Sequence, residues 1–360
     1  MQQIAAGIAK GILWEINMDE KTLEELTKKV QDWTNQVPLI ILGSGASIPF
    51  GIPSMSELGK HLKENITFSG TEDKEQFDSF KLEFEKSNDL ETTLLKLQLR
   101  DAVLNEIVCK TWSFINKKDV EFYEKLLQDN SIIPLSELIT YLLNTAQRKL
   151  TIVTTNYDRL AEYAASVANA FICNGFSQTY YGIFSTNIHK NNFSQTKGFA
   201  GQVNLWKVHG SLDWFSKNNI DCHLPMRRTI PDNYTPSIVT PGSTKYSMTH
   251  FEPYRTIFAE ADAEIINARS ILCVGYGFND VHVQPKLITQ IKNGKPIVVI
   301  TKELTTNTKA AIINNNCKNY CLFEQVNEKD TRVYSSLFSG EQIIQNVNYW
   351  KLDEYLNLIK

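Results

Sequence analysis

The chain has 360 residues, 42% of them hydrophobic, so it is long enough to bury one large core or two ordinary ones. Its 37 lysines and arginines nearly balance 40 aspartates and glutamates without a basic block, which argues against direct nucleic-acid binding. The six cysteines include no CxxC pair, which argues against a zinc ribbon and for reduced thiols in the cytoplasm.

Residues 1–34 are expected to form an N-terminal helical arm. The apolar stretch at residues 4–16 lacks a basic n-region and a small-residue cleavage site, and Lys10 and Glu15 interrupt it. We therefore expect neither a signal peptide nor a membrane span.

Residues 37–58 are the stretch around which the chain is organised. The run from Val37 to Leu42 predicts a buried strand, residues 43–47 (GSGAS) a glycine turn, and residues 54–58 the capped start of a helix. Gly43 and Gly45 would let the backbone approach a pyrophosphate closely, and the following helix would favour an anion at its N-terminus. The alternative is a turn that needs glycine only for a positive φ.

Residues 56–148 show mostly helical periodicity and are expected to form a helical insertion lobe, with a polar loop at residues 71–75. The apolar run from Leu150 to Thr154 predicts a second buried strand, which leads directly into Asn156 and Asp158. Polar groups at the carboxyl ends of parallel strands often carry function. The alternative is that both residues cap the helix that begins near Arg159.

The rest of the chain continues the alternation of strands and helices. Residues 174–203 are expected to form a long excursion and residues 203–208 a strand that ends at His209, whereas prolines predict irregular structure over residues 215–246. A helix is predicted over residues 251–268, strands over 270–274, 296–300 and 320–323, a helix over 307–313, and closing C-terminal helices over 331–360. This order indicates a Rossmann-like, doubly wound α/β fold with a mainly parallel sheet.

Motifs in a fixed order point to a family. They are GSGAS followed by GIP (51–53), TTNYD (154–158), VHGS (208–211) and GYG (275–277). Together they resemble the catalytic domain of sirtuins, and their variant forms look most like the sirtuin-like NAD hydrolases of bacterial anti-phage defence. The resemblance implies a catalytic domain over residues 35–330. The family's four-cysteine zinc module is not matched, because its region holds only Cys222 and Cys273, so we expect no metal.

The resemblance also implies roles for individual residues. The nicotinamide–ribose bond breaks through an oxocarbenium-like ribose, so the site must supply orientation, a polar group near the positive charge, and a held nucleophile. Asn156 is expected to orient the attacking water, Asp158 to hold the site or the nicotinamide amide, and His209 to act as general base. For Ser47, and for the turn at residues 275–279, plain capping and turn roles are the alternatives. The expected NAD-binding residues are Gly43, Ser44, Gly45, Ala46, Ser47, Pro53, Thr155, Gly275, Tyr276, Gly277 and Asn279.

By this resemblance the chain is expected to hydrolyse NAD to ADP-ribose and nicotinamide as a cytoplasmic effector of abortive infection. Such an effector must stay inactive until a signal arrives, and assembly of a homo-oligomer is one expected way to activate it. Because the chain has no GxxxxGK[ST] motif of its own, a partner protein such as a hexameric helicase-like ATPase is also expected. Neither nucleic acid nor a membrane is an expected direct partner. The alternatives are a zinc-free protein deacylase or ADP-ribosyltransferase, and a subunit that senses a nucleotide without cleaving it.

Overall fold

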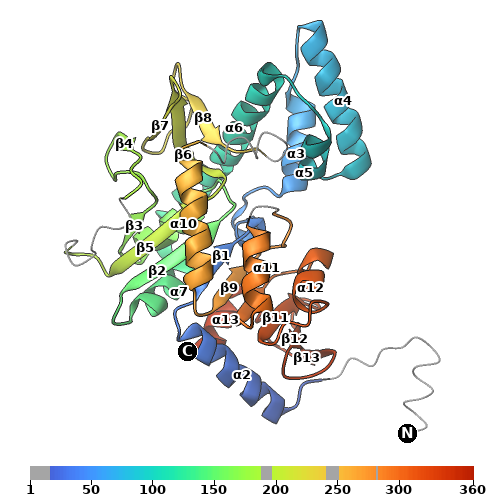
Figure 1. Cartoon of the computed structure of the whole chain (residues 1–360), viewed down its shortest axis with the longest axis vertical. Coiled ribbons are helices and arrows are strands. Elements are labelled where there is room, and N and C mark those ends of the chain that lie inside the picture. Colours follow the sequence, from blue (N-terminus) through green and yellow to red (C-terminus); the bar gives the residue numbers. More distant parts are fainter. Residues whose placement is uncertain (1–16, 188–196, 241–250, 281–282) are drawn as a thin grey trace. The chain divides into compact units, whose positions relative to one another are not determined.

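The computed structural model describes residues 17–187, 197–240, 251–280 and 283–360. The chain divides into two compact units. We call Leu39–Ala268 the central unit, and Met1–Pro38 with Arg269–Lys360 the terminal unit. Strands and helices alternate in each unit, which confirms the predicted α/β class (Figure 1).

The central unit contains a parallel sheet whose strands run in the order β1-β2-β5-β3. Their bounds are Leu39–Leu42 (β1), Lys149–Thr154 (β2), Gly201–Lys207 (β5) and Ala170–Cys173 (β3). All residues of β1 and β5 are buried, as expected for parallel strands that are covered on both faces. Leu42 pairs with Thr154, and Thr154 pairs with Lys207, so β1, β2 and β5 end at the same edge.

The chain between β1 and β2 forms the predicted helical lobe. Its helices are α3 (Met55–Asn65), α4 (Thr71–Ser87), α5 (Leu90–Lys96), α6 (Asp101–Leu126) and α7 (Pro134–Leu143). The prediction of a loop at residues 71–75 is wrong, because these residues form the first turn of α4. Glu72 and Asp73 lie there, and acidic side chains stabilise a helix N-terminus.

A small antiparallel sheet in the central unit was not predicted. Its order is β4 (Gly182–Ile183), β7 (Ile220–His223), β6 (Gly210–Lys217) and β8 (Thr235–Ile238). The prediction of irregular structure over residues 215–246 is therefore wrong for the end of β6, for β7 and for β8, and residues 241–246 lie outside the described residues. Pro236 is tolerated because β8 is an edge strand, where a proline removes no needed donor.

The helical lobe and the small sheet share one hydrophobic core. Trp112 of α6 packs its ring edge-on against Phe215 of β6, with centroids 5.7 Å apart, and its indole nitrogen donates to the Leu212 carbonyl at 2.8 Å. Figure 1 shows α6 beside β6 and β8. The central unit also contains α8 (Leu160–Val167) and α10 (Tyr254–Asn267), the latter within the predicted helix at residues 251–268.

The terminal unit has its own run of strands in the order β13-β12-β11-β10-β9. The parallel strands are β9 (Ile271–Val274), β10 (Ile297–Ile300) and β11 (Tyr320–Gln325), all near predicted positions. Its helices are α2 (Glu20–Thr34), α11 (Gln284–Lys292), α12 (Thr306–Ile312) and α13 (Leu352–Ile359). The Thr34 hydroxyl of α2 hydrogen-bonds the Tyr355 hydroxyl of α13 at 3.0 Å. Residues 1–16 of the predicted arm lie outside the described residues.

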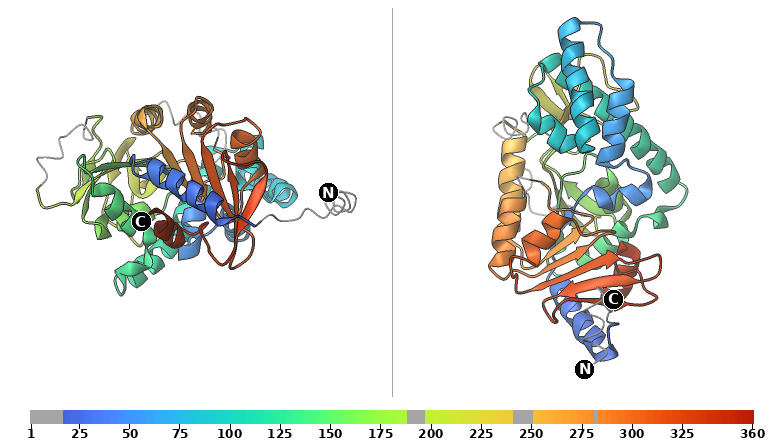
Figure 2. Two further views of the ribbon diagram at one scale, coloured as in Figure 1. Left: turned by 90° about the horizontal axis from the view of Figure 1, so that it is seen from below. Right: turned by 90° about the vertical axis from the view of Figure 1, so that its right-hand side faces the viewer.

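The prediction of closing helices over residues 331–360 is wrong for its first half. Residues in this half form β12 (Thr331–Ser335) and β13 (Glu341–Ile344), which pair antiparallel (red in Figure 2), and only α13 is helical. Thr331, Val333 and Ser335 are the buried residues of β12, a period of two that favours a strand. In the described part of the chain, no helix has both the length and the apolarity that crossing a bilayer requires.

Candidate functional site

Predicted site segments follow the ends of neighbouring strands in the central unit. Gly43 comes directly after β1, Asn156 lies two residues after the end of β2, and His209 lies two residues after the end of β5. Because the last residues of these strands are paired in register, the three segments leave the sheet at the same edge. This is the edge at which open α/β sheets bind ligands.

The glycine turn after β1 does not need a positive φ at its first two glycines. Gly43 has a φ of −105°, and Gly45 lies in a short 3-10 turn over Ser44–Ala46. Among the described glycines with positive φ, the one in this stretch is Gly51, at 86°. The alternative explanation of Gly43 and Gly45 is therefore wrong, whereas a close approach by another group remains a reason for glycine at both positions.

The predicted helix start after the turn is confirmed. The Ser54 hydroxyl accepts from the backbone N–H of Glu57, and the Glu57 carboxylate accepts from the backbone N–H of Ser54, which forms a complete capping box for α3. Pro53 immediately precedes this cap and is half-buried. In the turn itself the Ser44 side chain is exposed, whereas Ser47 is buried.

Asn156 joins the end of β2 to the glycine turn. Its Nδ2 donates to the Gly43 carbonyl at 2.9 Å and to the Ser47 hydroxyl at 3.1 Å. Both amide hydrogens are thus used within the protein, which fixes the orientation of the side chain and makes Oδ1 the atom that can accept from a ligand or water. The backbone N–H of Asn156 donates to the Thr154 hydroxyl at 3.1 Å, with Thr155 half-buried between them.

Asp158 lies one residue before the N-cap of α8, which is Arg159, so it is not the cap that the alternative described. Its Oδ1 accepts from the backbone N–H of Leu160 at 3.1 Å, at the start of α8, and its side chain is buried. Burial raises the pKa of the Asp158 carboxyl, while the Lys207 charge and a hydrogen bond from Ser47 oppose that rise. Ser47 therefore hydrogen-bonds both Asn156 and Asp158. The contact of Asp158 with nicotinamide stays a prediction.

The backbone around His209 is tightly held. The His209 carbonyl accepts from the Val239 N–H at 2.9 Å, and the Val239 carbonyl accepts from the Tyr157 hydroxyl at 2.7 Å. Gly210 has a φ of 86°, and a Cβ at this position would lie 2.2 Å from the Ser237 carbonyl oxygen. Only glycine fits at position 210, so the backbone of this turn explains the glycine of the His-Gly dipeptide but not the histidine. His209 itself is buried.

Lys207 is a charged residue next to the site that was not among the predicted site residues. It is the last residue of β5, its side chain is 0% exposed, and its ammonium donates to the main-chain carbonyl of Asp158. The ammonium also contacts the Glu162 carboxylate at 3.0 Å. A lysine within the otherwise mainly apolar run at residues 203–208 is the signal that could have revealed it, because buried charges are paired.

Arg159 forms a second buried network close to the same turn. Its guanidinium donates to Asp119 of α6 at 2.8 Å, to Asp213 of β6 at 2.7 Å and to the Asn116 side chain at 2.7 Å. Burial alone would lower the pKa of Arg159, but Asp213 and Asp119 together raise it, so the guanidinium stays charged. It joins α6, α8 and the small sheet.

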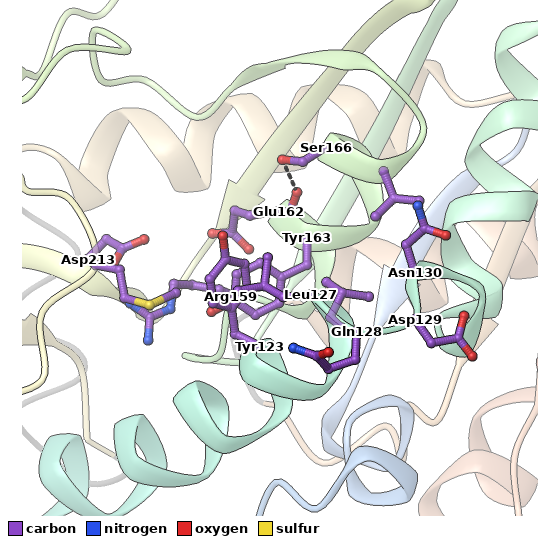
Figure 3. A pocket seen from close by; sticks show the side chains of 13 residues that line it. Tyr123, Leu127, Gln128, Asp129, Asn130, Arg159, Glu162, Tyr163, Ser166 and Asp213 are labelled. Carbon is purple, nitrogen blue, oxygen red and sulfur yellow. Dashed lines mark hydrogen bonds and ion pairs between the residues drawn. The ribbon is translucent and has the colours of Figure 1, made fainter.

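A pocket of about 700 Å³ opens beside this network, between α6 and α8 (Figure 3). Asp213 lies at one end of it and Asp129 toward the other, with Arg159, Glu162 and Tyr163 between them. None of the residues that line it is a predicted site residue. Burial raises the pKa of Glu162 to about 7, although Lys207 opposes the rise.

The second glycine turn lies in the terminal unit. Gly275 has a φ of 58°, and Tyr276 is buried. The Gly277 carbonyl accepts from the Thr305 hydroxyl at 2.6 Å, and the Asn279 side chain accepts from Asn307 at 2.8 Å. The contact of these residues with the adenosine ribose stays a prediction.

All six cysteines are free thiols. Within the part of the chain that the structure describes, no group of three or more His, Cys, Asp or Glu side chains is arranged to hold a metal ion.

Residues 150–305 match the family model of the SIR2-like domain. The matched stretch includes Asn156, Asp158 and His209 but not the first glycine turn. No curated protein matches the sequence.

The chain is also similar to solved structures. One is a complex of a Sir2 homologue with NAD, at 14% identity over 86% of this chain and 90% of that chain, with a TM-score of 0.43. Another concerns the mechanism and regulation of Sir2 enzymes, at 14% identity over 80% and 90% of the two chains, with a TM-score of 0.43. A third is Sir2 bound to an acetylated peptide, at 14% identity over 78% and 88%, with a TM-score of 0.36.

Proposed function

We propose that this chain cleaves the nicotinamide–ribose bond of NAD and transfers the ADP-ribosyl group to water. The observation that carries the proposal is the pair of hydrogen bonds from Asn156 Nδ2 to Gly43 and Ser47. It fixes an amide at the edge where the glycine turn and the His209 segment also leave the sheet. The match of residues 150–305 to the SIR2-like domain supports the same conclusion.

Cleavage of the nicotinamide–ribose bond requires few catalytic groups from such a site. The nicotinamide leaves as a neutral molecule, so no acid is needed to protonate it, and the ribose develops positive charge as the bond breaks. Asn156 Oδ1 accepts a hydrogen bond from the attacking water and holds it beside the ribose carbon. The carbonyl dipole of the same amide is also suited to face a developing positive charge.

His209 and Asp158 complete the proposed machinery. The His209 imidazole hydrogen-bonds a ribose hydroxyl and receives the proton of the attacking water, as a general base does. Asp158 keeps the turn that carries Asn156 in place by accepting a hydrogen bond from the Leu160 N–H and by its link to Ser47. Its predicted contact with the nicotinamide amide belongs to the proposal.

We further propose that the cleavage serves anti-phage defence and that a partner protein or self-association activates it. Uncontrolled loss of NAD would kill the host cell, so an enzyme of this kind must be silent until a signal arrives. The proposed partner is a hexameric helicase-like ATPase, since the chain carries no P-loop motif.

The test is incubation of the purified protein with NAD, with and without the product of the neighbouring gene, followed by chromatography. Equal amounts of nicotinamide and ADP-ribose are expected, and Asn156→Ala should lower the rate at which both are released by about a hundredfold or more. Asn357→Ala is the matched control, because Asn357 is exposed on α13. Binding of NAD without turnover in every condition would contradict the proposal. Transfer of radiolabel from NAD to protein, with little free ADP-ribose, would contradict it in favour of a transferase.

A further inference from the structure

Lys207 is a fully buried cation to which the proposed reaction gives no role. Its ammonium donates to the Asp158 main-chain carbonyl and lies 3.0 Å from a Glu162 carboxylate oxygen. Removing an ammonium from water is costly, and the cost is offset only when the partners are well placed. The burial of a lysine at this position therefore requires an explanation.

Stabilisation of α8 does not explain why Lys207 is buried here. Glu162 lies in the first turn of α8, and Asp158 directly precedes the helix cap. The N-terminal end of a helix carries a partial positive charge, so a cation is unfavourable there. Glu162 offsets this repulsion, but a neutral pair of similar shape would remove the problem altogether. The ion pair with Glu162 explains how the buried charge of Lys207 is tolerated, but not why a lysine occupies this position.

The position of Lys207 relative to the proposed site suggests an answer. Asp158 follows Asn156 by two residues, and Lys207 precedes His209 by two residues. One ammonium thus fastens the turn after β2 to the end of β5. The side chain of Asn156 is fixed on its other side by Gly43 and Ser47, so the turn is held from both directions.

We propose that Lys207 is a positioning residue of the NAD site, which holds the Asp158 carbonyl and thereby sets the placement of Asn156 relative to His209. Glu162, which faces the pocket of Figure 3, keeps the ammonium directed at that carbonyl. The inference rests on the proposed NAD cleavage for its catalytic consequence. Its structural part does not depend on that activity.

The experiment compares three variants of the full chain. Lys207→Met removes the ammonium but leaves the Glu162 carboxylate buried without its cation, so this variant is expected to be destabilised. Lys207→Met combined with Glu162→Gln removes both charges and keeps the side-chain volumes, so stability should recover. Glu162→Gln alone leaves the buried ammonium without its carboxylate and should also be destabilised, so Asn357→Ala, at an exposed position of α13, is the control.

Two readouts distinguish positioning from charge balance. In the double variant, amide hydrogen exchange over residues 155–163 should rise by about tenfold or more, because the turn has lost one of its two attachments. NAD turnover should fall by on the order of a hundredfold in kcat, since a displacement of about 1 Å costs that much. Asn357→Ala should stay within about threefold of the unsubstituted protein in both measurements.

A double variant with unchanged exchange and unchanged kcat would overturn the proposal, because Lys207 would then serve only to balance Glu162. If the unsubstituted protein cleaves no NAD with any partner, the proposed function fails, and hydrogen exchange alone decides the role of Lys207. Raised exchange in the double variant would then support a positioning role, and unchanged exchange would reject it.

Discussion

Replacement of Asn156 tests the proposed site at a single side chain. Asn156→Ala removes the hydrogen bonds from Nδ2 to the Gly43 carbonyl and the Ser47 hydroxyl, at 2.9 Å and 3.1 Å. Each such bond contributes about 0.5–1.5 kcal/mol net, so the free energy of unfolding should fall by about 1–3 kcal/mol. The protein should stay folded at 25 °C, because the strands on either side are fully buried.

The catalytic effect of the same change should be much larger than its effect on stability. Loss of the group that orients the water is expected to lower kcat by about a hundredfold or more. Circular dichroism and thermal unfolding would follow the fold, and chromatographic release of nicotinamide would follow the reaction. A folded Asn156→Ala protein that releases nicotinamide within threefold of the unsubstituted rate would refute the reasoning.

Asn156→Asp tests the donor nitrogen of the amide separately from its acceptor oxygen. It keeps an acceptor oxygen but replaces the donor nitrogen with a second oxygen, which faces the Gly43 carbonyl and cannot donate to it. We therefore expect the Asp variant to be as inactive as the Ala variant. An active Asp variant would show that the hydrogen bonds donated by Nδ2 are not needed.

Other predictions concern the turn after β5, the buried carboxylate and the helical lobe. Gly210→Ala should lower the free energy of unfolding by at least about 1–3 kcal/mol, because the new Cβ meets a carbonyl oxygen at a φ of 86°; unchanged thermal unfolding would contradict this. Burial is the main cause that raises the pKa of Glu162 from 4.5 to about 7. The protonated Glu162 side chain therefore contributes fully to the free energy of unfolding below pH 4.5, and this contribution is lost as the pH rises through 7. Between pH 4 and pH 8 this loss is roughly 3 kcal/mol. Urea unfolding of Glu162→Gln across that range should therefore show a pH dependence of the free energy of unfolding that is smaller by this amount. An unchanged pH dependence would show that the carboxylate is not buried as described. Phe80→Ala should cost about 3–5 kcal/mol in urea unfolding, because Phe80 is fully buried between Phe77 and Phe84; a cost below 1 kcal/mol would place this ring outside the core.

The parallel strands were predictable because each is a continuous apolar run. Residues 37–42, 150–154, 270–274 and 296–300 are bounded by polar or glycine residues, and each overlaps a strand of the structure. Burial on both faces removes any need for alternation, so the signal is simple. The small antiparallel sheet gave no such signal, because its strands are short and one contains Pro236.

The candidate site was predictable in its residue types but not in its contacts. Asn156 and Gly43 are far apart in the sequence, and only the pairing of β1 with β2 brings them within hydrogen-bond distance. The sequence left capping open for both Asn156 and Asp158, but the N-cap of α8 is Arg159, and Asp158 instead accepts a hydrogen bond from the Leu160 N–H. Lys207 was missed because a lysine near the end of a mainly apolar run is usually interpreted as the solvated end of a strand.

The most direct test of the central claim is to determine where ADP-ribose binds in crystals of this protein. We predict that the pyrophosphate lies beside residues 43–47, with a ribose within hydrogen-bond distance of Asn156 and His209. ADP-ribose bound only in the pocket between α6 and α8, or on another surface away from Asn156, would contradict the account.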